Sequence, residues 1–249
     1  MGRLAGKVAL VTGSGRNIGR ATVLKLAAEG AHVIVNARAN RAEAEAVARE
    51  ARDLGVEALA VLADLARRDQ IEAMVAQAFD RFGRIDILIN NAAIRPHKPF
   101  TELTAEDWEE VRGVVLDGAL HLTRAVIPAM VERRYGRILF FTGEGAFTGG
   151  SGRAHVSAAK MGLVGLARAL ASEFAASNIR VNVVSPGSID TVRAHPEWYR
   201  GHVPSAAGIP LGRQGTVDEI AATCLFLVSD DGGFITGQTI HVNGGSAYY

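Results

Sequence analysis

Short apolar runs alternate along the chain with longer amphipathic stretches, and this alternation limits the fold more than any other feature. The runs begin at Val8, His32, Glu57, Ile85, Gly136, Ile179 and Thr239. Between them lie Ala-, Glu- and Arg-rich stretches such as 41–55, whose apolar spacing suits helices. Strands that are apolar throughout are buried on both faces, which is typical of a parallel sheet covered by helices. The sequence therefore predicts an α/β fold with a doubly wound parallel sheet, as a single domain over residues 1–249.

One segment breaks the alternation. Residues 191–215 carry prolines, glycines and aromatic residues where another helix–strand unit would begin. A long irregular excursion in a compact domain is usually a lid or a binding loop. We expect a substrate lid here.

Charge and cysteine content exclude several classes of protein. The 27 Lys and Arg residues against 26 Asp and Glu give a net charge of +1, so neither nucleic acid nor a membrane surface is an expected partner. The one cysteine, Cys224, lies in an apolar stretch and reads as a buried structural thiol in a reducing cytoplasm. No apolar run approaches membrane-spanning length. No set of His, Asp or Glu has metal-ligand spacing, so no metal is expected.

A glycine-rich turn follows the first apolar run, and a helical pattern follows the turn at once. Such a turn lets the backbone approach a pyrophosphate, which then lies on the positive end of the helix. With the strand before it and the helix after it, the turn predicts a Rossmann-type dinucleotide site. Its residues are Thr12, Gly13, Ser14, Gly15, Arg16, Asn17, Ile18 and Gly19.

The end of the second predicted strand indicates which dinucleotide binds. NAD-selective sites place a carboxylate there for the ribose 2′-hydroxyl. This chain has Asn36, Ala37 and Arg38 instead. Arg38 and Arg16 could hold a 2′-phosphate through charge-assisted hydrogen bonds, which favours NADP(H) over NAD(H). The alternative for Arg38 is a solvated surface arginine.

Several motifs together resemble the short-chain dehydrogenase/reductase family, in particular the type that includes 3-oxoacyl-carrier-protein reductases. They are the Thr12–Gly19 turn, Asn90-Asn91-Ala92-Ala93, Pro186-Gly187 with Thr191, Ile235-Thr236-Gly237-Gln238, and Val242-Asn243-Gly244-Gly245. The resemblance implies a homotetramer built on the long fourth and fifth interstrand helices and the C-terminal segment. It also implies cofactor contacts from Asp64, Leu65, Asn91, Ala92, Ala93, Lys160, Pro186, Gly187, Ile189 and Thr191.

The reaction residues that the resemblance implies are largely missing. Family members use a tyrosine as acid, a lysine four residues later, a serine that polarises the carbonyl and an asparagine upstream. Lys160 matches the lysine, and the tyrosine position is then Val156. The serine position falls on Gly143 and the asparagine position on Val115. Ordinary alcohol–carbonyl chemistry is therefore not expected.

Two neighbouring side chains are candidates to replace the missing acid. Glu144 adjoins the serine position, and either a catalytic role or plain solvation suits it. His155 adjoins the tyrosine position, but a helix rotates it about 100° away, so a structural role is favoured. Arg95, His97 and Arg153 could rim the pocket, and His195, Trp198, Tyr199 and His202 could reach it from the lid.

Two functions remain open. The first is an NADP(H)-dependent oxidoreductase with an altered proton donor, such as one that reduces an activated carbon–carbon double bond of a small substrate. Family relatives that act on dienoyl thioesters similarly lack the tyrosine at its usual position. The second is a cofactor-binding protein without turnover, either a silent subunit paired with an active homologue or a regulator. The kept Lys160, glycine turn and Thr191 favour the first.

Overall fold

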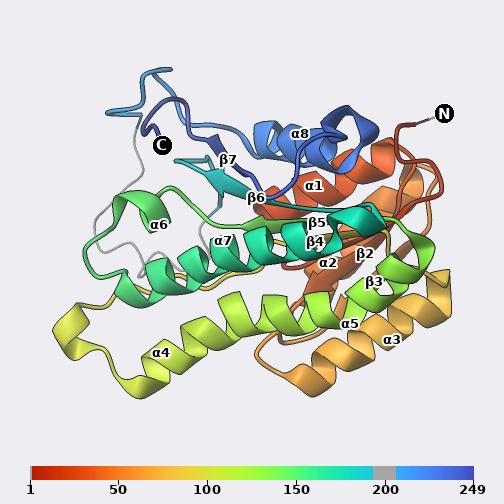
Figure 1. The fold of residues 1–249 in the computed structure, drawn as a ribbon, viewed down its shortest axis with the longest axis horizontal. Helices are drawn as coiled ribbons and strands as arrows, with labels where there is room; N and C mark the ends of the chain where they lie inside the picture. Colours follow the sequence, from red (N-terminus) through yellow and green to blue (C-terminus); the bar gives the residue numbers. More distant parts are fainter. Residues whose placement is uncertain (1, 193–205) are drawn as a thin grey trace.

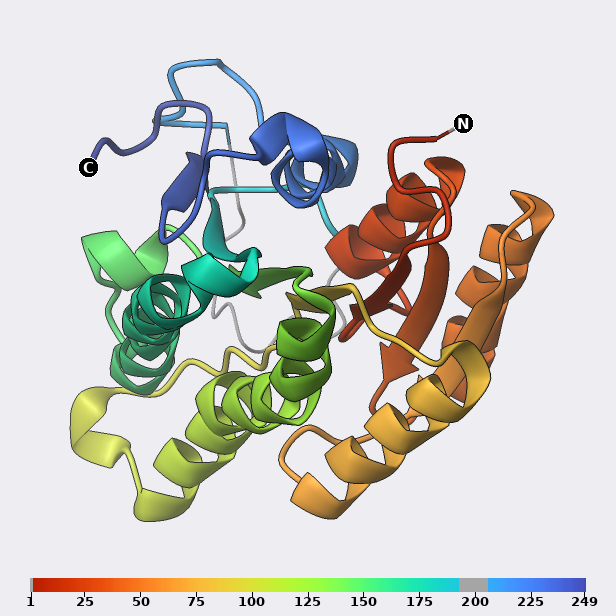
Figure 2. The ribbon, with the colours of Figure 1, turned by 45° about the vertical axis from the view of Figure 1, so that its right-hand side comes forward.

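A computed structural model describes residues 2–192 and 206–249, which form a seven-stranded parallel sheet between two layers of helices (Figures 1 and 2). The strands are β1 (Val8–Val11), β2 (His32–Ala37), β3 (Ala58–Leu62), β4 (Ile87–Asn90), β5 (Gly136–Phe141), β6 (Ile179–Pro186) and β7 (Thr239–Val242). Their order is β3-β2-β1-β4-β5-β6-β7, so the chain winds outward from β1 and then from β4. The doubly wound parallel sheet is confirmed, with a strand at each of the seven apolar runs.

Eight α-helices occur in the described part of the chain. They are α1 (Asn17–Ala28), α2 (Arg41–Asp53), α3 (Arg68–Phe82), α4 (Ala105–Arg112), α5 (Gly118–Arg133), α6 (Gly145–Thr148), α7 (Ala154–Phe174) and α8 (Val217–Val228). Short 3₁₀ turns are η1 (Phe100–Glu102), η3 (Ala175–Ser177) and η5 (Asp230–Gly232). Between α4 and α5 the backbone widens into a π-helical turn, η2 (Gly113–Asp117).

Each central strand buries both of its faces, which explains why the runs are apolar throughout. On β4, Leu88 packs into the core beneath α3, α5 and α7, whereas its neighbours Ile87 and Ile89 pack into the core beneath α1, α2 and α8 (Figure 2). All three are 0% exposed. A strand sandwiched in this way needs mostly apolar residues on both of its faces.

The helical run Ala105–Arg133 corrects the expectation about membrane-spanning length. It is long and apolar enough to cross a membrane by length and composition. However, Leu122, Val126 and Met130 are 0% exposed and belong to the main core. The run is a core helix of the fold.

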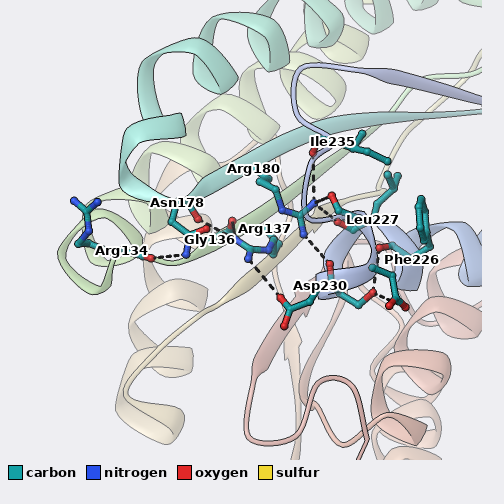
Figure 3. A network of polar contacts seen from close by, with 12 residues as sticks. Arg134, Gly136, Arg137, Asn178, Arg180, Phe226, Leu227, Asp230 and Ile235 are labelled. Atoms are coloured by element: carbon teal, nitrogen blue, oxygen red, sulfur yellow. Dashed lines mark hydrogen bonds and ion pairs between the residues drawn. The ribbon is translucent and has the colours of Figure 1, made fainter.

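Two buried arginines lie at the amino ends of β5 and β6, opposite the strand ends that carry the site (Figure 3). The Arg180 guanidinium donates to the carbonyls of Leu227, Ser229 and Gly232 at 2.7–2.8 Å. Arg137 donates to the Asn178 carbonyl at 2.9 Å. Burial, with Arg137 nearby, lowers the pKa of Arg180 to about 10, so it stays charged at neutral pH. Carbonyls at the end of α8 that have no partner within the helix thus accept hydrogen bonds from the charged Arg180 guanidinium.

The ends of the irregular segment 191–215 pack beside β6. Ile189 pairs with Gly215 in an isolated parallel bridge, and the Asp190 N–H donates to the Gly215 carbonyl at 2.9 Å. Cys224, on α8, is a buried free thiol, and burial raises its pKa to about 12. Both its burial and that pKa agree with a structural role. The lid candidates His195, Trp198, Tyr199 and His202 lie outside the described residues.

Candidate cofactor and reaction site

A cleft of about 590 Å³ opens where the carboxyl ends of the strands meet. Its walls come from the glycine-rich turn after β1, the ends of β2 and β3, the loop after β4, the end of β5, Lys160 on α7 and the segment after β6. The chain reverses its winding between β1 and β4, and dinucleotides bind at such switch points in open α/β sheets. The cleft therefore lies where the sequence predicted the cofactor.

The glycines of the turn leave no room for side chains. A Cβ on Gly19 would stand 2.5 Å from the Gly13 carbonyl oxygen, and one on Gly13 would stand 2.9 Å from the Ala92 Cα. Gly13 also has a φ of 60°, in the left-handed region that favours glycine. The first turn of α1 is thereby brought against the ends of β1 and β4.

Polar side chains hold this turn from beneath. The Asn36 Oδ1 accepts from the Gly13 N–H at 3.2 Å, and the Asn91 Nδ2 donates to the carbonyls of Thr12 and Gly13 at 2.9 and 3.1 Å. The Ser14 hydroxyl donates to the Val11 carbonyl at 2.6 Å and is fully buried. Ser14 therefore supports the turn and does not line the cleft. Asn91 does line the cleft, and its side-chain amide also supports the turn. Asn36 was not among the sequence candidates, although it stands at the end of a predicted strand.

The amino end of α1 fits a pyrophosphate. No side chain caps it, and its first turn holds no acidic residue. Its backbone N–H groups and the positive end of the helix are the donor set that a phosphate prefers. Asn17 has a φ of 50°, and its side-chain amide exchanges two hydrogen bonds with the backbone of Val192, at 2.8 and 3.0 Å. Asn17 thus ties the segment after β6 to the turn.

Arg16, in the glycine-rich turn, and Arg38, directly after β2, line the half of the cleft that contains this turn. We call this part the adenine end, because the sequence predicts the adenine ribose there. Asp64 and Leu65, after β3, line it as well. Sequence reasoning missed Glu43, in the first turn of α2, whose Oε2 lies 3.4 Å from the position of a Cβ on Gly15. Asn40, the side-chain cap of α2, brings Glu43 there and is a signal the sequence contains.

The opposite end of the cleft is the reaction half, by which we mean Ala92–Arg95, Val114, Phe141–Gly143, Lys160, Pro186–Ile189, Thr191 and Val192. The backbones of Gly187 and Asn243 pack closely together, because a Cβ on Gly187 would stand 2.7 Å from the Asn243 Cα. The Thr142 hydroxyl turns toward β6 and donates weakly to the Val184 carbonyl at 3.4 Å. Ala92, Ala93, Pro186, Gly187, Ile189 and Thr191, which the sequence assigned to the cofactor, all lie on this wall.

Lys160 is the buried cation of the reaction half. It is 5% exposed, and its Nζ donates to the Phe141 carbonyl at 2.5 Å. Burial, and to a smaller degree the nearby Arg95 charge, lowers the pKa of Lys160 to about 7. An amine in these surroundings can take up and release a proton at neutral pH.

The two proposed replacement acids do not line the cleft. Glu144 turns toward the C-terminal segment, where its Oε1 accepts from the Ser246 hydroxyl at 2.6 Å. The backbone of Glu144 is held separately, because its N–H donates to the Pro186 carbonyl at 3.0 Å. His155 is 1% exposed, and neither ring nitrogen has a hydrogen-bond partner among the described residues. Burial lowers the pKa of His155 and favours its neutral form.

Of the expected rim residues, Arg95 lines the cleft. Arg153 donates to the Arg95 carbonyl, and the Lys98 N–H donates to the Gly152 carbonyl at 2.9 Å. These bonds join the loop after β4 to the start of α7. The His97 ring packs over Gly152, within 2.4 Å of the position of a Cβ there, and is not part of the cleft wall.

Comparison with known proteins assigns the family. A family model described as enoyl-(acyl carrier protein) reductase matches residues 13–247. The chain belongs to the short-chain dehydrogenase/reductase family. A 3-oxoacyl-[acyl-carrier-protein] reductase of Synechocystis is 38% identical over 250 residues and covers 100% of both chains. One from Thermotoga maritima is 36% identical over 98% of both chains. A crystal structure assigned as a short-chain alcohol dehydrogenase of Sinorhizobium meliloti has a TM-score of 0.91 at 31% identity, covering 98% of this chain and 97% of that one.

In this short-chain dehydrogenase/reductase, the three residues at the expected reaction positions are apolar. Val156 lies one helical turn before Lys160 on α7 and is buried in the core. Val115 is buried within the π-helical turn η2. Gly143 follows β5 and lines the cleft. None of the three carries a side-chain oxygen or nitrogen.

Proposed function

We propose that this protein is an NADP(H)-dependent reductase that works without the tyrosine acid and acts on an activated carbon–carbon double bond. One observation carries the proposal. The half of the cleft suited to the dinucleotide keeps the glycine-rich turn, the uncapped end of α1 and two lining arginines. By contrast, Val115, Gly143 and Val156 stand where the resemblance expects an asparagine, a serine and a tyrosine. Hydride transfer requires a bound nicotinamide cofactor, and this half of the cleft keeps the residues suited to hold one.

NADPH is the proposed cofactor. Arg16 and Arg38 both line the adenine end, and guanidinium groups suit a 2′-phosphate. The free N–H groups at the start of α1 suit the pyrophosphate. When bound, the cofactor supplies a hydride from its nicotinamide. The chain itself orients the ring with Pro186, Ile189 and Thr191.

An alkene fits the reaction half better than a ketone. Carbonyl reduction needs a donor on the carbonyl oxygen and an acid for the alkoxide, and neither Gly143 nor Val156 has one. Loss of a positioned general acid costs about 10²–10⁴-fold in rate. Reduction of an activated alkene can take its proton from solvent or from another side chain. The matching family model is itself described as an enoyl-(acyl carrier protein) reductase, and the two relatives compared above are named 3-oxoacyl-[acyl-carrier-protein] reductases.

The second candidate is a cofactor-binding protein without turnover, acting as a silent subunit beside an active homologue or as a regulator. The observation that favours it is the same apolar trio of Val115, Gly143 and Val156. The two candidates differ in whether bound NADPH is ever oxidised by the protein alone.

The deciding experiment follows NADPH absorbance at 340 nm against a panel of ketones, 3-oxoacyl thioesters, enones and enoyl thioesters. We expect stereospecific reduction of enones or enoyl thioesters and very poor turnover of ketones. Glu144→Gln and His155→Ala serve as controls, since neither residue lines the cleft. Oxidation of NADPH that begins only after a homologue is added would establish the silent subunit. Ready ketone reduction by the wild type would refute the proposed reaction.

We also propose a homotetramer. Leu120 on α5 and Met161 on α7 are 39% and 40% exposed, and Phe226 on α8 is 42% exposed. The terminal Tyr248 and Tyr249 are 83% and 62% exposed. The exposed apolar side chains on α5 and α7 suit one interface between subunits, and those on α8 and the C-terminal segment suit a second. Light scattering at micromolar concentration would refute the assembly if it gave the 26.3 kDa of one chain.

A further inference from the structure

We propose that the Lys160 amine is the general acid of this protein and delivers the proton that completes the reduction. The inference rests on the proposed function. After hydride addition leaves an enolate on the substrate, one N–H bond of the Lys160 ammonium breaks and its electron pair stays on Nζ. The proton forms a bond to the α-carbon of the enolate. Water then returns a proton to the neutral amine.

The position of Nζ supports this role. Lys160 lines the reaction half of the cleft, and within the described part of the chain its Nζ donates one hydrogen bond, to the Phe141 carbonyl at 2.5 Å. An ammonium has three N–H donors. Since Phe141 ends β5 directly before the cleft, this bond anchors Nζ at the cleft wall and leaves two donors for a bound molecule.

No other side chain of the described reaction half can do this work. Its ionisable members are Lys160 and Arg95. A guanidinium does not release its proton in proteins, so Arg95 can stabilise negative charge but cannot serve as an acid. One turn before Lys160, Val156 is apolar, so no phenol stands at that position. Glu144 is bonded to Ser246 away from the cleft.

The electrostatic surroundings prepare the amine for proton transfer. Among the described residues, the charged group that acts on Lys160 is Arg95, from the loop after β4, and none of their carboxylates forms an ion pair with the Lys160 ammonium. Burial lowers the Lys160 pKa to about 7, which matches the working pH that an efficient general acid needs. The ammonium is the active form, so the rate is full below that pKa and is lost as the pH rises through it.

The first test reads the proton on Nζ directly, without substrate. The chain has four lysines, namely Lys7, Lys25, Lys98 and Lys160. In protein labelled with ¹³C and ¹⁵N at lysine, Lys160→Met assigns the Lys160 signal by its disappearance. We expect that signal to titrate near pH 7. A Lys160 ammonium that persists above about pH 9 would overturn the inference, because the group would then resemble an ordinary lysine.

The second test compares pH profiles of enone reduction. Lys160→Arg keeps the cation near the cofactor but holds its proton permanently. We expect kcat to fall about 10²–10⁴-fold and the loss of rate above neutral pH to disappear, while NADPH affinity measured by calorimetry changes little. Lys98→Arg is the matched control, because Lys98 pairs with Asp107 away from the cleft.

Each outcome separates the two proposals. A pH profile and kcat that Lys160→Arg leaves untouched, with active wild type, would overturn the proton role and leave the reductase standing. Failure of the wild type to reduce any alkene would overturn the reductase and this inference with it.

Discussion

The two halves of the cleft are built in opposite ways. In the cofactor half, the glycine-rich turn is held by Asn36 and Asn91, and close packing at Gly13 and Gly19 excludes even a methyl group. In the reaction half, a Cβ on Gly143 would meet its nearest atom, the Pro186 carbonyl oxygen, only at 3.9 Å. The cofactor half therefore leaves no room for a side chain at Gly13 or Gly19, whereas the reaction half leaves room at Gly143.

This difference shows where the sequence is constrained. A dinucleotide is recognised by backbone donors, whose positions depend on many residues at once. Proton chemistry depends on a few side-chain atoms, which single substitutions remove without disturbing the fold. Binding and chemistry can therefore separate within one cleft, and each half can be tested by itself.

The largest expected effect comes from refilling the reaction half. Gly143→Ser with Val156→Tyr should raise 3-oxoacyl thioester reduction by about 10²–10⁴-fold, because it restores a donor and an acid one turn before Lys160. The open space at Gly143 accepts a hydroxymethyl group. Steady-state oxidation of NADPH measures the gain.

Gly143→Ser with Val156→Phe is the control for that gain, since it adds the same ring without the phenol. An equal gain in the phenylalanine variant would show that shape, not proton donation, limits the wild type. No gain in a folded, NADPH-binding tyrosine variant would contradict the assignment of Val156 to the tyrosine position.

The next effect damages the cofactor half. Gly19→Ala places a Cβ 2.5 Å from the Gly13 carbonyl oxygen, so the turn must shift. We expect NADPH affinity to fall at least about 100-fold, roughly 2.7 kcal/mol, by calorimetry. Gly165→Ala on α7 is the control, because a Cβ there meets nothing within 4 Å. A folded Gly19→Ala protein of normal affinity would show that the cofactor does not use this turn.

A smaller effect concerns the choice of dinucleotide. Wild type should bind NADPH at least about tenfold tighter than NADH, roughly 1.4 kcal/mol, and Arg38→Ala should remove most of that preference. Calorimetric titration with both cofactors measures it. Equal affinities in the wild type would place Arg38 among the solvated surface residues.

The smallest effect has the opposite sign. Glu43 brings a carboxylate to the adenine end, where it would repel the 2′-phosphate of the proposed NADPH. Glu43→Gln should therefore raise the preference for NADPH by about threefold, the scale of an exposed charge interaction. The same titrations at two salt concentrations test the cause, since screening by salt should shrink the difference.

Much of the fold was determined by local pattern. Apolar runs without alternation at 87–89 and 138–141 predict strands buried on both faces, and that requires helices on either side. The glycines of the turn between Gly13 and Gly19 likewise predicted its close packing, because glycine is the residue that permits a close backbone approach. The apolar identity of Val156 was visible in the sequence alone.

The directions of side chains were decided by contacts between distant segments. Glu144 was a candidate acid by its place after β5, but its carboxylate bonds to Ser246, 102 residues away. Ser14 was placed in the cofactor site by the motif, and its hydroxyl instead bonds beneath the turn. The π-helical turn at 113–117 could not be predicted from the apolar spacing, because it changes a single turn within a continuous helical run.

Lys160 shows the division most clearly. Its spacing from the other motifs could be read from the chain, and so could the apolar residue, Val156, four positions before it. Its 5% exposure and its bond to the Phe141 carbonyl required α7 to pack against the end of β5. A pKa depends on the removal of water around a charge, and only the assembled tertiary structure removes that water.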